Sequence, residues 1–204
     1  ETNRALVDAI SDIHLPYTEH ARQYLLTLGI HPSKIFVTGS PLCEVYEHYQ
    51  SNIKQSDILK KLQLSQKKYF VVSTHREENV DRVSRLKNLF HAFSTLAELY
   101  KFPIYVSLHP HTAKMMKRVT DIHPLIKFHK PFGYFDYVHL QKHALCVLSD
   151  SGSIQEESAI GNFTAVQLRV NLERQEAFDA GSILLTGTHP MAIMHAVQMV
   201  IDRS

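Results

Sequence analysis

The sequence predicts an α/β fold built on a parallel sheet. Short β-branched runs alternate with longer amphipathic stretches, and the runs are apolar throughout rather than alternating. Continuous apolar strands are typical of parallel sheets, because helices cover both faces of such a sheet. The 204 residues suffice for one good core, or for one domain and part of another. The expected strands are 11–15, 34–38, 69–74, 104–108, 125–128, 145–149, 164–168 and 183–185.

Three helices can be placed between these strands from their end signals and periodicity. Thr18 is expected to cap a helix that Gly29 closes, because a Thr side chain accepts a bond from an unpaired amide and Gly tolerates a left-handed turn. Residues 83–100 carry apolar side chains at three- and four-residue spacing, which indicates an amphipathic helix. Pro190 can open a last helix. The polar segment 49–66 separates an early block from the longer α/β block.

The composition argues against several classes of protein. The net charge is only +2 with 14 histidines neutral, and this balance is too weak to indicate a nucleic-acid partner. No apolar stretch approaches the roughly 20 residues of a membrane span, and no signal peptide is visible. Cys43 and Cys146 lie in no C-x-x-C pair, so we expect free thiols in the reducing cytoplasm.

The turn that follows the expected strand ending at residue 149 is predicted to bind phosphate. Ser151, Gly152 and Ser153 precede a helix, so their backbone N–H groups and hydroxyls would stand at a helix N-terminus. Glu156 and Glu157 follow in the first turns of that helix. A carboxylate there favours the helix through its dipole, and one of the two is alternatively a hydrogen-bond acceptor for a ribose diol.

Charged side chains also follow three other expected strands, where open parallel sheets bind their ligands. His75 and Arg76 follow one strand, and His109 follows the next. His75 is interpreted as a group for proton transfer or for a hydrogen bond to a phosphate oxygen, the alternative being a structural histidine. Arg169 and Arg174 suit a diphosphate, or else belong to a solvated helix start. No H-E-x-x-H and no Cys/His cluster of zinc spacing occurs, which argues against a metal.

Several short segments share their pattern and order with one known family. They are Glu1-Thr2-Asn3-Arg4, Ser11-Asp12, Pro16-Tyr17-Thr18-Glu19, Ile35-Phe36-Val37-Thr38-Gly39, His75-Arg76-Glu77-Glu78-Asn79, the run 150–157, the run 169–177 and Ala180-Gly181. Together they resemble the non-hydrolysing UDP-N-acetylglucosamine 2-epimerase family over nearly the whole chain. Ser153 replaces the family's usual Gly, and Gln175 replaces its usual Pro. The run 130–137, with the Glu-rich motif at His75 and with Ser40-Pro41, looks most like the branch that makes UDP-N-acetyl-L-fucosamine or a related 6-deoxy-L-amino sugar.

The resemblance implies a Rossmann-like lobe of a GT-B-type two-lobed fold. Residues 1–40 would be the tail of the first lobe with its crossover, and residues 41–204 the UDP-binding lobe. Because residue 1 is Glu rather than Met, we expect the C-terminal portion of a longer protein. That protein would be a bacterial cytoplasmic homodimer in capsule or O-antigen amino-sugar synthesis. This portion alone is expected to bind a uridine nucleotide and to turn over poorly or not at all.

The implied reaction inverts C2 of a UDP-N-acetylhexosamine by eliminating UDP to a glycal and adding it back, with no metal and no redox cofactor. By carry-over, Glu1 and His75 fall on catalytic positions, and His75 alternatively contacts phosphate. The implied UDP contacts are Arg76, His109, Ser151, Gly152, Ser153, Glu157, Arg169 and Arg174.

Three alternative functions stay open at this point. A GT-B glycosyltransferase would share the fold and the turn, and a hydrolysing 2-epimerase would release free sugar with UDP. A non-catalytic UDP-sugar-binding module would bind the nucleotide without exchanging the C2 hydrogen.

Overall fold

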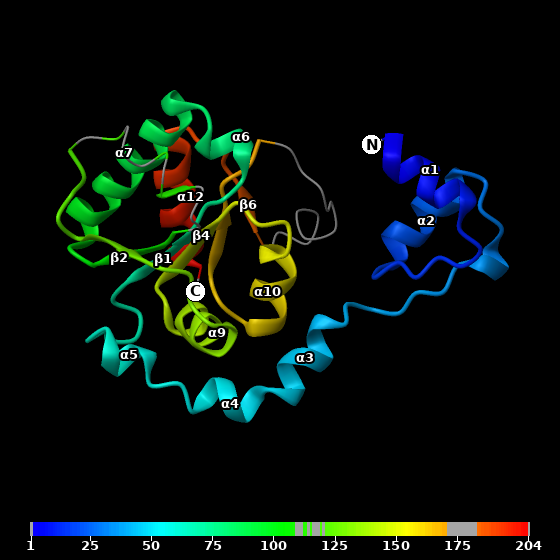
Figure 1. Ribbon diagram of the computed structural model, residues 1–204, viewed down its shortest axis with the longest axis horizontal. Coiled ribbons are helices and arrows are strands. Elements are labelled where there is room, and N and C mark those ends of the chain that lie inside the picture. Colours follow the sequence, from blue (N-terminus) through cyan, green and yellow to red (C-terminus); the bar gives the residue numbers. More distant parts are fainter. Residues whose placement is uncertain are drawn as a thin grey trace. The chain divides into compact units, whose positions relative to one another are not determined.

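The computed structural model describes residues 2–108, 112–113, 115, 119, 121–170 and 183–203 (Figure 1). The chain divides into two compact units, Glu1–Glu47 and His48–Ser204. The assignment of 1–40 and 41–204 to two lobes of a larger fold stays a prediction.

The described residues of the second unit form a fully parallel six-stranded sheet with the order β3-β2-β1-β4-β5-β6 (Figure 1). The strands are β1 (Phe70–Ser73), β2 (Ile104–Ser107), β3 (Ile126–His129), β4 (Cys146–Ser149), β5 (Ala165–Gln167) and β6 (Leu184–Leu185). Each falls on an expected strand, so the predicted α/β fold with a parallel sheet is confirmed. The order is that of dinucleotide-binding Rossmann sheets.

The position of β1 fixes where this sheet can bind a ligand. β1 pairs with β2 on one side and with β4 on the other, so strand order reverses between β1 and β4. In open α/β sheets, ligands bind outside the carboxyl ends of the strands at this switch point. Ser73 and Ser149 are the last paired residues of the two strands. The residues that follow them therefore stand at the ligand-binding edge.

Helices cover both faces of the sheet, as the apolar strands predict. On one face lie α7 (Val83–Tyr100) and α12 (Pro190–Asp202), and on the other α5 (Ile58–Lys61), α9 (Tyr134–His143) and α10 (Ile154–Gly161) (Figure 1). Phe70 and Val72 of β1 pack under the first pair, whereas Tyr69 and Val71 pack under the other three. This alternation buries both faces and so fixes the register of β1.

The three helices expected from sequence signals are confirmed. α7 has the predicted bounds, and α12 begins at Pro190. α2 (Glu19–Thr27) is capped by Thr18, whose Oγ1 accepts a hydrogen bond from the Ala21 N–H at 3.1 Å. Gly29 after this helix has a φ of +82°, a conformation that glycine adopts without strain.

The predicted strands 11–15 and 34–38 are wrong. The first unit contains α1 (Thr2–Ile10), α2 and the 3-10 turn η1 (Pro32–Lys34), and these two segments share only one parallel bridge, His14 with Ile35. The His14 N–H donates to the Lys34 carbonyl at 2.8 Å. A lone pair of extended segments is at best marginally stable as a sheet. Ile13, beside the bridge, is 63% exposed, so little burial supports a longer pairing.

The polar segment 49–66 is packed on the sheet's helical layer. It follows α3 (Leu42–His48) and contains α4 (Gln50–Lys54) and α5, and the apolar residues Ile53 and Ile58 are buried. The Ile53 carbonyl lies 2.8 Å from His139 Nδ1 on α9. This segment therefore belongs to the second unit by its contacts.

Candidate functional site

The loops that follow β1 and β4 meet at one buried carboxylate. Asp150 directly follows β4 and has no exposed surface. Its Oδ1 accepts a bond from the His75 backbone N–H at 3.1 Å, and its Oδ2 accepts one from the Arg76 N–H at 3.1 Å. A buried charge is costly unless donors surround it. These amides explain how the fold tolerates a carboxylate here.

Asn79 extends this network to a third strand end. It lies in the short helix α6 (Glu77–Val80) and is buried. Its Nδ2 donates to Asp150 Oδ2 at 3.1 Å and to the Leu168 carbonyl, just after β5, at 2.9 Å. One side chain thereby ties the ends of β1, β4 and β5 together.

The sequence motifs contain Asp150 and Asn79, but the sequence analysis assigns neither a role. The available signal was a carboxylate placed directly after an apolar strand. A buried carboxylate needs hydrogen-bond donors. One of the donors to Asp150 is Asn79, which is 71 residues away in the sequence. Only the strand order brings the two motifs together.

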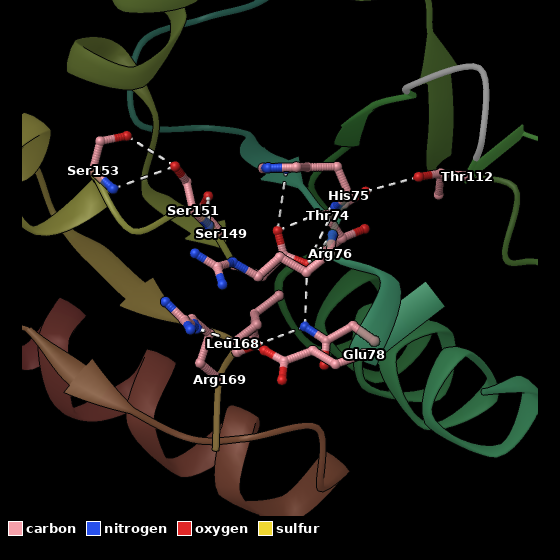
Figure 2. A network of polar contacts seen from close by, with 12 residues as sticks. Thr74, His75, Arg76, Glu78, Thr112, Ser149, Ser151, Ser153, Leu168 and Arg169 are labelled. Atoms are coloured by element: carbon pink, nitrogen blue, oxygen red, sulfur yellow. Dashed lines mark hydrogen bonds and ion pairs between the residues drawn. The ribbon is translucent and has the colours of Figure 1, made fainter. Parts of the chain in front are cut away.

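His75 stands at the strand end where the sequence predicts it. Its Nδ1 lies 3.3 Å from Asp150 Oδ1, and its side chain is 49% exposed. In Figure 2 the side chains of His75, Arg76 and Arg169 extend toward the side where Ser151 and Ser153 lie. The arrangement thus brings an imidazole, two guanidinium groups and a serine turn to one edge.

The turn predicted to bind phosphate precedes α10, with Ser153 at the N-cap. Within the turn the Ser151 N–H donates to Ser149 Oγ at 3.1 Å, and the Ser153 N–H to Ser151 Oγ at 3.3 Å. The Ser151 and Ser153 hydroxyl oxygens are 2.8 Å apart. Hydroxyls and amides therefore already form a compact polar turn at the N-terminal end of a helix, where the dipole favours an anion.

Two buried glutamines connect this turn to β5 through hydrogen bonds. Gln167 of β5 donates from Nε2 to the Ser151 carbonyl at 3.1 Å. Its Oε1 accepts a bond from Gln155 Nε2 at 2.8 Å, and both glutamines are buried. No role was predicted for either glutamine from the sequence. They fix the turn to β5 and so limit how far it can move.

Glu157, the predicted ribose contact, is oriented by one donor on each oxygen. Ser153 Oγ donates to Oε1 at 2.5 Å, and Gln141 Nε2 of α9 donates to Oε2 at 2.6 Å. A carboxylate oxygen has two lone pairs, so each keeps capacity to accept a further hydrogen bond. Burial raises the pKa of the neighbouring Tyr137 well above its usual range, and the Glu157 charge adds to this. Tyr137 therefore stays a neutral hydroxyl.

Arg169 is a buried cation at the end of β5. It is 3% exposed, and its Nε lies 3.7 Å from Glu78 Oε1. A cavity of about 430 Å³ opens beside it, lined by Asn88, Arg169, Val170 and residues 185–189. A guanidinium that borders a cavity at a strand end can serve an anionic ligand.

Three predicted site residues lie outside the residues that the structure describes: Glu1, His109 and Arg174. Gln175, at the second departure from the family pattern, also lies outside them. Among the described residues, no three His, Cys, Asp or Glu side chains come together as a possible metal site. Within the same residues, no helix is both long and apolar enough to cross a membrane.

Comparison with known proteins finds one family over the whole chain. A family model described as UDP-N-acetylglucosamine 2-epimerase matches residues 1–204. The UDP-N-acetylglucosamine 2-epimerase of Methanocaldococcus jannaschii is 33% identical over 211 residues, covering 100% of this chain and 58% of that protein. The chain thus spans somewhat more than half the length of this relative.

Solved structures show the same likeness. The M. jannaschii enzyme in complex with UDP-GlcNAc and UDP has a TM-score of 0.89 at 32% identity, covering 100% of this chain and 58% of that one. The UDP-N-acetylglucosamine 2-epimerase of Rickettsia bellii has a TM-score of 0.85 at 35% identity, covering 98% of this chain and 54% of that one.

Proposed function

This chain belongs to the UDP-N-acetylglucosamine 2-epimerase family, and we propose that it is the UDP-binding part of an enzyme that inverts C2 of a UDP-N-acetylhexosamine. One observation carries the proposal. The polar groups of the two motif segments, 75–79 and 150–157, converge at the switch point of a Rossmann-type sheet. A relative of this fold at 32% identity was solved with UDP-GlcNAc and UDP bound.

The proposed nucleotide contacts follow the geometry of the strand ends. Ser151, Gly152 and Ser153 would receive the diphosphate at the N-terminal end of α10, where the helix dipole favours negative charge. Glu157 would accept hydrogen bonds from the ribose diol, since Ser153 and Gln141 orient its carboxylate while leaving lone pairs.

The proposed cations are Arg76 and Arg169, which would neutralise charge on the departing diphosphate. His109 and Arg174 stay proposed UDP contacts on the strength of the motif pattern alone. Arg169 lies beside a cavity and close to Glu78, so an anionic ligand there would compete with a partly exposed carboxylate.

The reaction has two halves that these groups can serve. In the first, a base removes the C2 proton while the C1–O bond breaks, which releases UDP and leaves a glycal. In the second, UDP adds back at C1 and a proton is delivered to the opposite face of C2. Both halves need proton transfer at C2 and stabilisation of the diphosphate, and we propose that His75 is one of the groups that handle protons or phosphate. Glu1 is the other proposed catalytic residue, by its motif.

Four expectations stay predictions. They are that the enzyme belongs to the branch acting on 6-deoxy-L-sugars, that it is a homodimer, that it works in the bacterial cytoplasm, and that it serves polysaccharide synthesis. The chain spans 58% of the length of the M. jannaschii relative. The epimerase activity should therefore be tested on the complete gene product.

The decisive assay is hydrogen exchange at C2. The complete gene product is incubated in D₂O with UDP-GlcNAc and, separately, with UDP-2-acetamido-2,6-dideoxy-L-hexoses. The proposal expects deuterium at C2 of both epimers, with the UDP-sugar intact. Release of free sugar and UDP would identify a hydrolysing enzyme instead. Tight binding with no exchange for any of these sugars would contradict the epimerase and favour a binding module.

A further inference from the structure

We propose that Asp150 is a positioning residue for His75, which it holds as the Nδ1–H tautomer so that Nε2 is the nitrogen presented to the ligand. The role of His75 toward a substrate rests on the proposed function. The tautomer itself does not, because it follows from contacts within the chain.

The donors around Asp150 show that this side chain acts as an acceptor. Oδ1 accepts the His75 N–H, and Oδ2 accepts the Arg76 N–H and the Asn79 amide. Both Asp150 oxygens accept hydrogen bonds, as expected of an ionised carboxylate. The carboxylate therefore presents lone pairs, and no proton, to a neighbouring group. His75 Nδ1 lies 3.3 Å from Oδ1. A ring nitrogen this close to a carboxylate oxygen is favoured by electrostatics when it carries the proton and disfavoured when it carries a lone pair.

The carboxylate has no freedom to turn away from the ring. It is fully buried, and Asn79 anchors it to the Leu168 carbonyl through a second bond from the same amide group. Two of its other donors are the backbone amides of His75 and Arg76, the loop that carries the imidazole. The loop and the carboxylate therefore fix each other, which places the His75 side chain beside Oδ1.

The tautomer decides what chemistry His75 can perform. With the proton on Nδ1, neutral Nε2 is an acceptor, which suits removal of a proton from a bound ligand. A ring that has taken up a proton at Nε2 could then donate it from the same nitrogen. With the opposite tautomer, neutral Nε2 would be a donor only. In serine proteases, changing the aspartate beside the histidine to Asn leaves the geometry intact but gives the wrong tautomer and lowers kcat by about 10⁴.

A purely structural brace is the competing explanation, and Asn79 separates the two. Asp150→Asn keeps the size of the side chain but places an amide near the ring. Asn79→Ala loosens the same buried network without changing the group that faces Nδ1. A brace predicts similar consequences for both variants, whereas a positioning role predicts a tautomer change in Asp150→Asn alone.

The test is ¹⁵N NMR of the histidine ring nitrogens in the ¹⁵N-histidine-labelled chain at about pH 8, where most histidines are neutral. The His75 signals are identified by their loss in His75→Gln. We expect the Nδ1–H form in the parent and in Asn79→Ala, and a shift toward the Nε2–H form in Asp150→Asn. An Nε2–H form in the parent, or an unchanged tautomer in a folded Asp150→Asn, would overturn the inference. The parent spectrum decides even if Asp150→Asn does not fold.

UDP is then titrated into the parent sample. The predicted tautomer without UDP binding would count against the proposed function alone. UDP binding with the opposite tautomer would count against the role of Asp150 alone.

Discussion

Ser73 of β1 and Ser149 of β4 lie opposite each other in parallel register, and the Asp150 N–H continues the pairing by donating to the Ser73 carbonyl at 3.2 Å. Two segments that are more than 70 residues apart in sequence therefore leave the sheet at the same level. Asp150 follows Ser149 directly and His75 follows Ser73 by two residues, so the register of two neighbouring strands builds the proposed site.

Replacing the proposed ribose contact should weaken nucleotide binding. Glu157→Ala is expected to weaken UDP binding by about 1–3 kcal/mol, because a charge-assisted hydrogen bond is lost. Glu156→Ala is the matched control, since it removes the same charge from the same helical turn. Isothermal titration calorimetry measures both. Equal losses in the two variants would show that only the local charge matters, and no loss in Glu157→Ala would remove Glu157 from the site.

Arg169 should contribute to binding of the diphosphate and not of the nucleoside. We expect Arg169→Gln to reduce the affinity for UDP at least tenfold while changing the affinity for uridine little, because uridine carries no phosphate. Arg85→Gln is the control, because Arg85 is another arginine that contacts Glu78. Its guanidinium donates to the Glu78 backbone carbonyl at 2.9 Å. Competition binding with UDP and uridine gives the comparison. A similar loss for both ligands would indicate a structural role for Arg169.

The buried network at the strand ends should also support the fold. Asn79→Ala removes the bonds to Asp150 and Leu168 and is expected to lower the free energy of unfolding by about 1–3 kcal/mol, because buried acceptors lose a donor. Asn88→Ala, at an exposed position of α7, should stay within about 0.5 kcal/mol of the parent. Urea denaturation followed by circular dichroism measures both. A neutral Asn79→Ala would contradict the network.

The two cysteines should differ sharply in reactivity. Cys146 lies in the buried strand β4, and burial raises the pKa of its thiol to about 12, whereas Cys43 is exposed. Since the thiolate is the reactive form, only about 10⁻⁴ of Cys146 would be reactive at pH 8. We expect Ellman's reagent to modify one thiol per chain in buffer and two in denaturant. Rapid modification of both in buffer would contradict the burial of β4.

The sequence predicts the sheet of the second unit well because its central strands β1, β4 and β5 are buried on both faces. The apolar run that contains Phe70 to Val72 predicts a buried strand regardless of which face each side chain lies on. The apolar residues at 83–100 repeat with a clear helical period. The sequence fails at 11–15 and 34–38, where apolar residues such as Ile13 are exposed and one bridge is all that forms. Apolar composition alone does not provide the neighbours that a strand needs.

The candidate site is predictable in outline for a similar reason. Strand ends are visible in the sequence, so His75, Arg169 and the turn 151–153 could be placed at the ligand edge in advance. Asp150 and Gln141 were not identified, because their roles come from partners on other elements. Pairwise contacts across 70 or more residues depend on strand order, which periodicity does not encode.

A ¹H–¹⁵N spectrum of this chain titrated with UDP would locate the nucleotide site residue by residue. We expect saturable shifts of backbone amides that cluster after β1 and β4, at residues 74–76 and 150–157, with β3 and the first unit largely unchanged. Saturable shifts that centre elsewhere would contradict UDP binding at the switch point. So would unchanged chemical shifts of these amides in both the folded chain and the complete gene product.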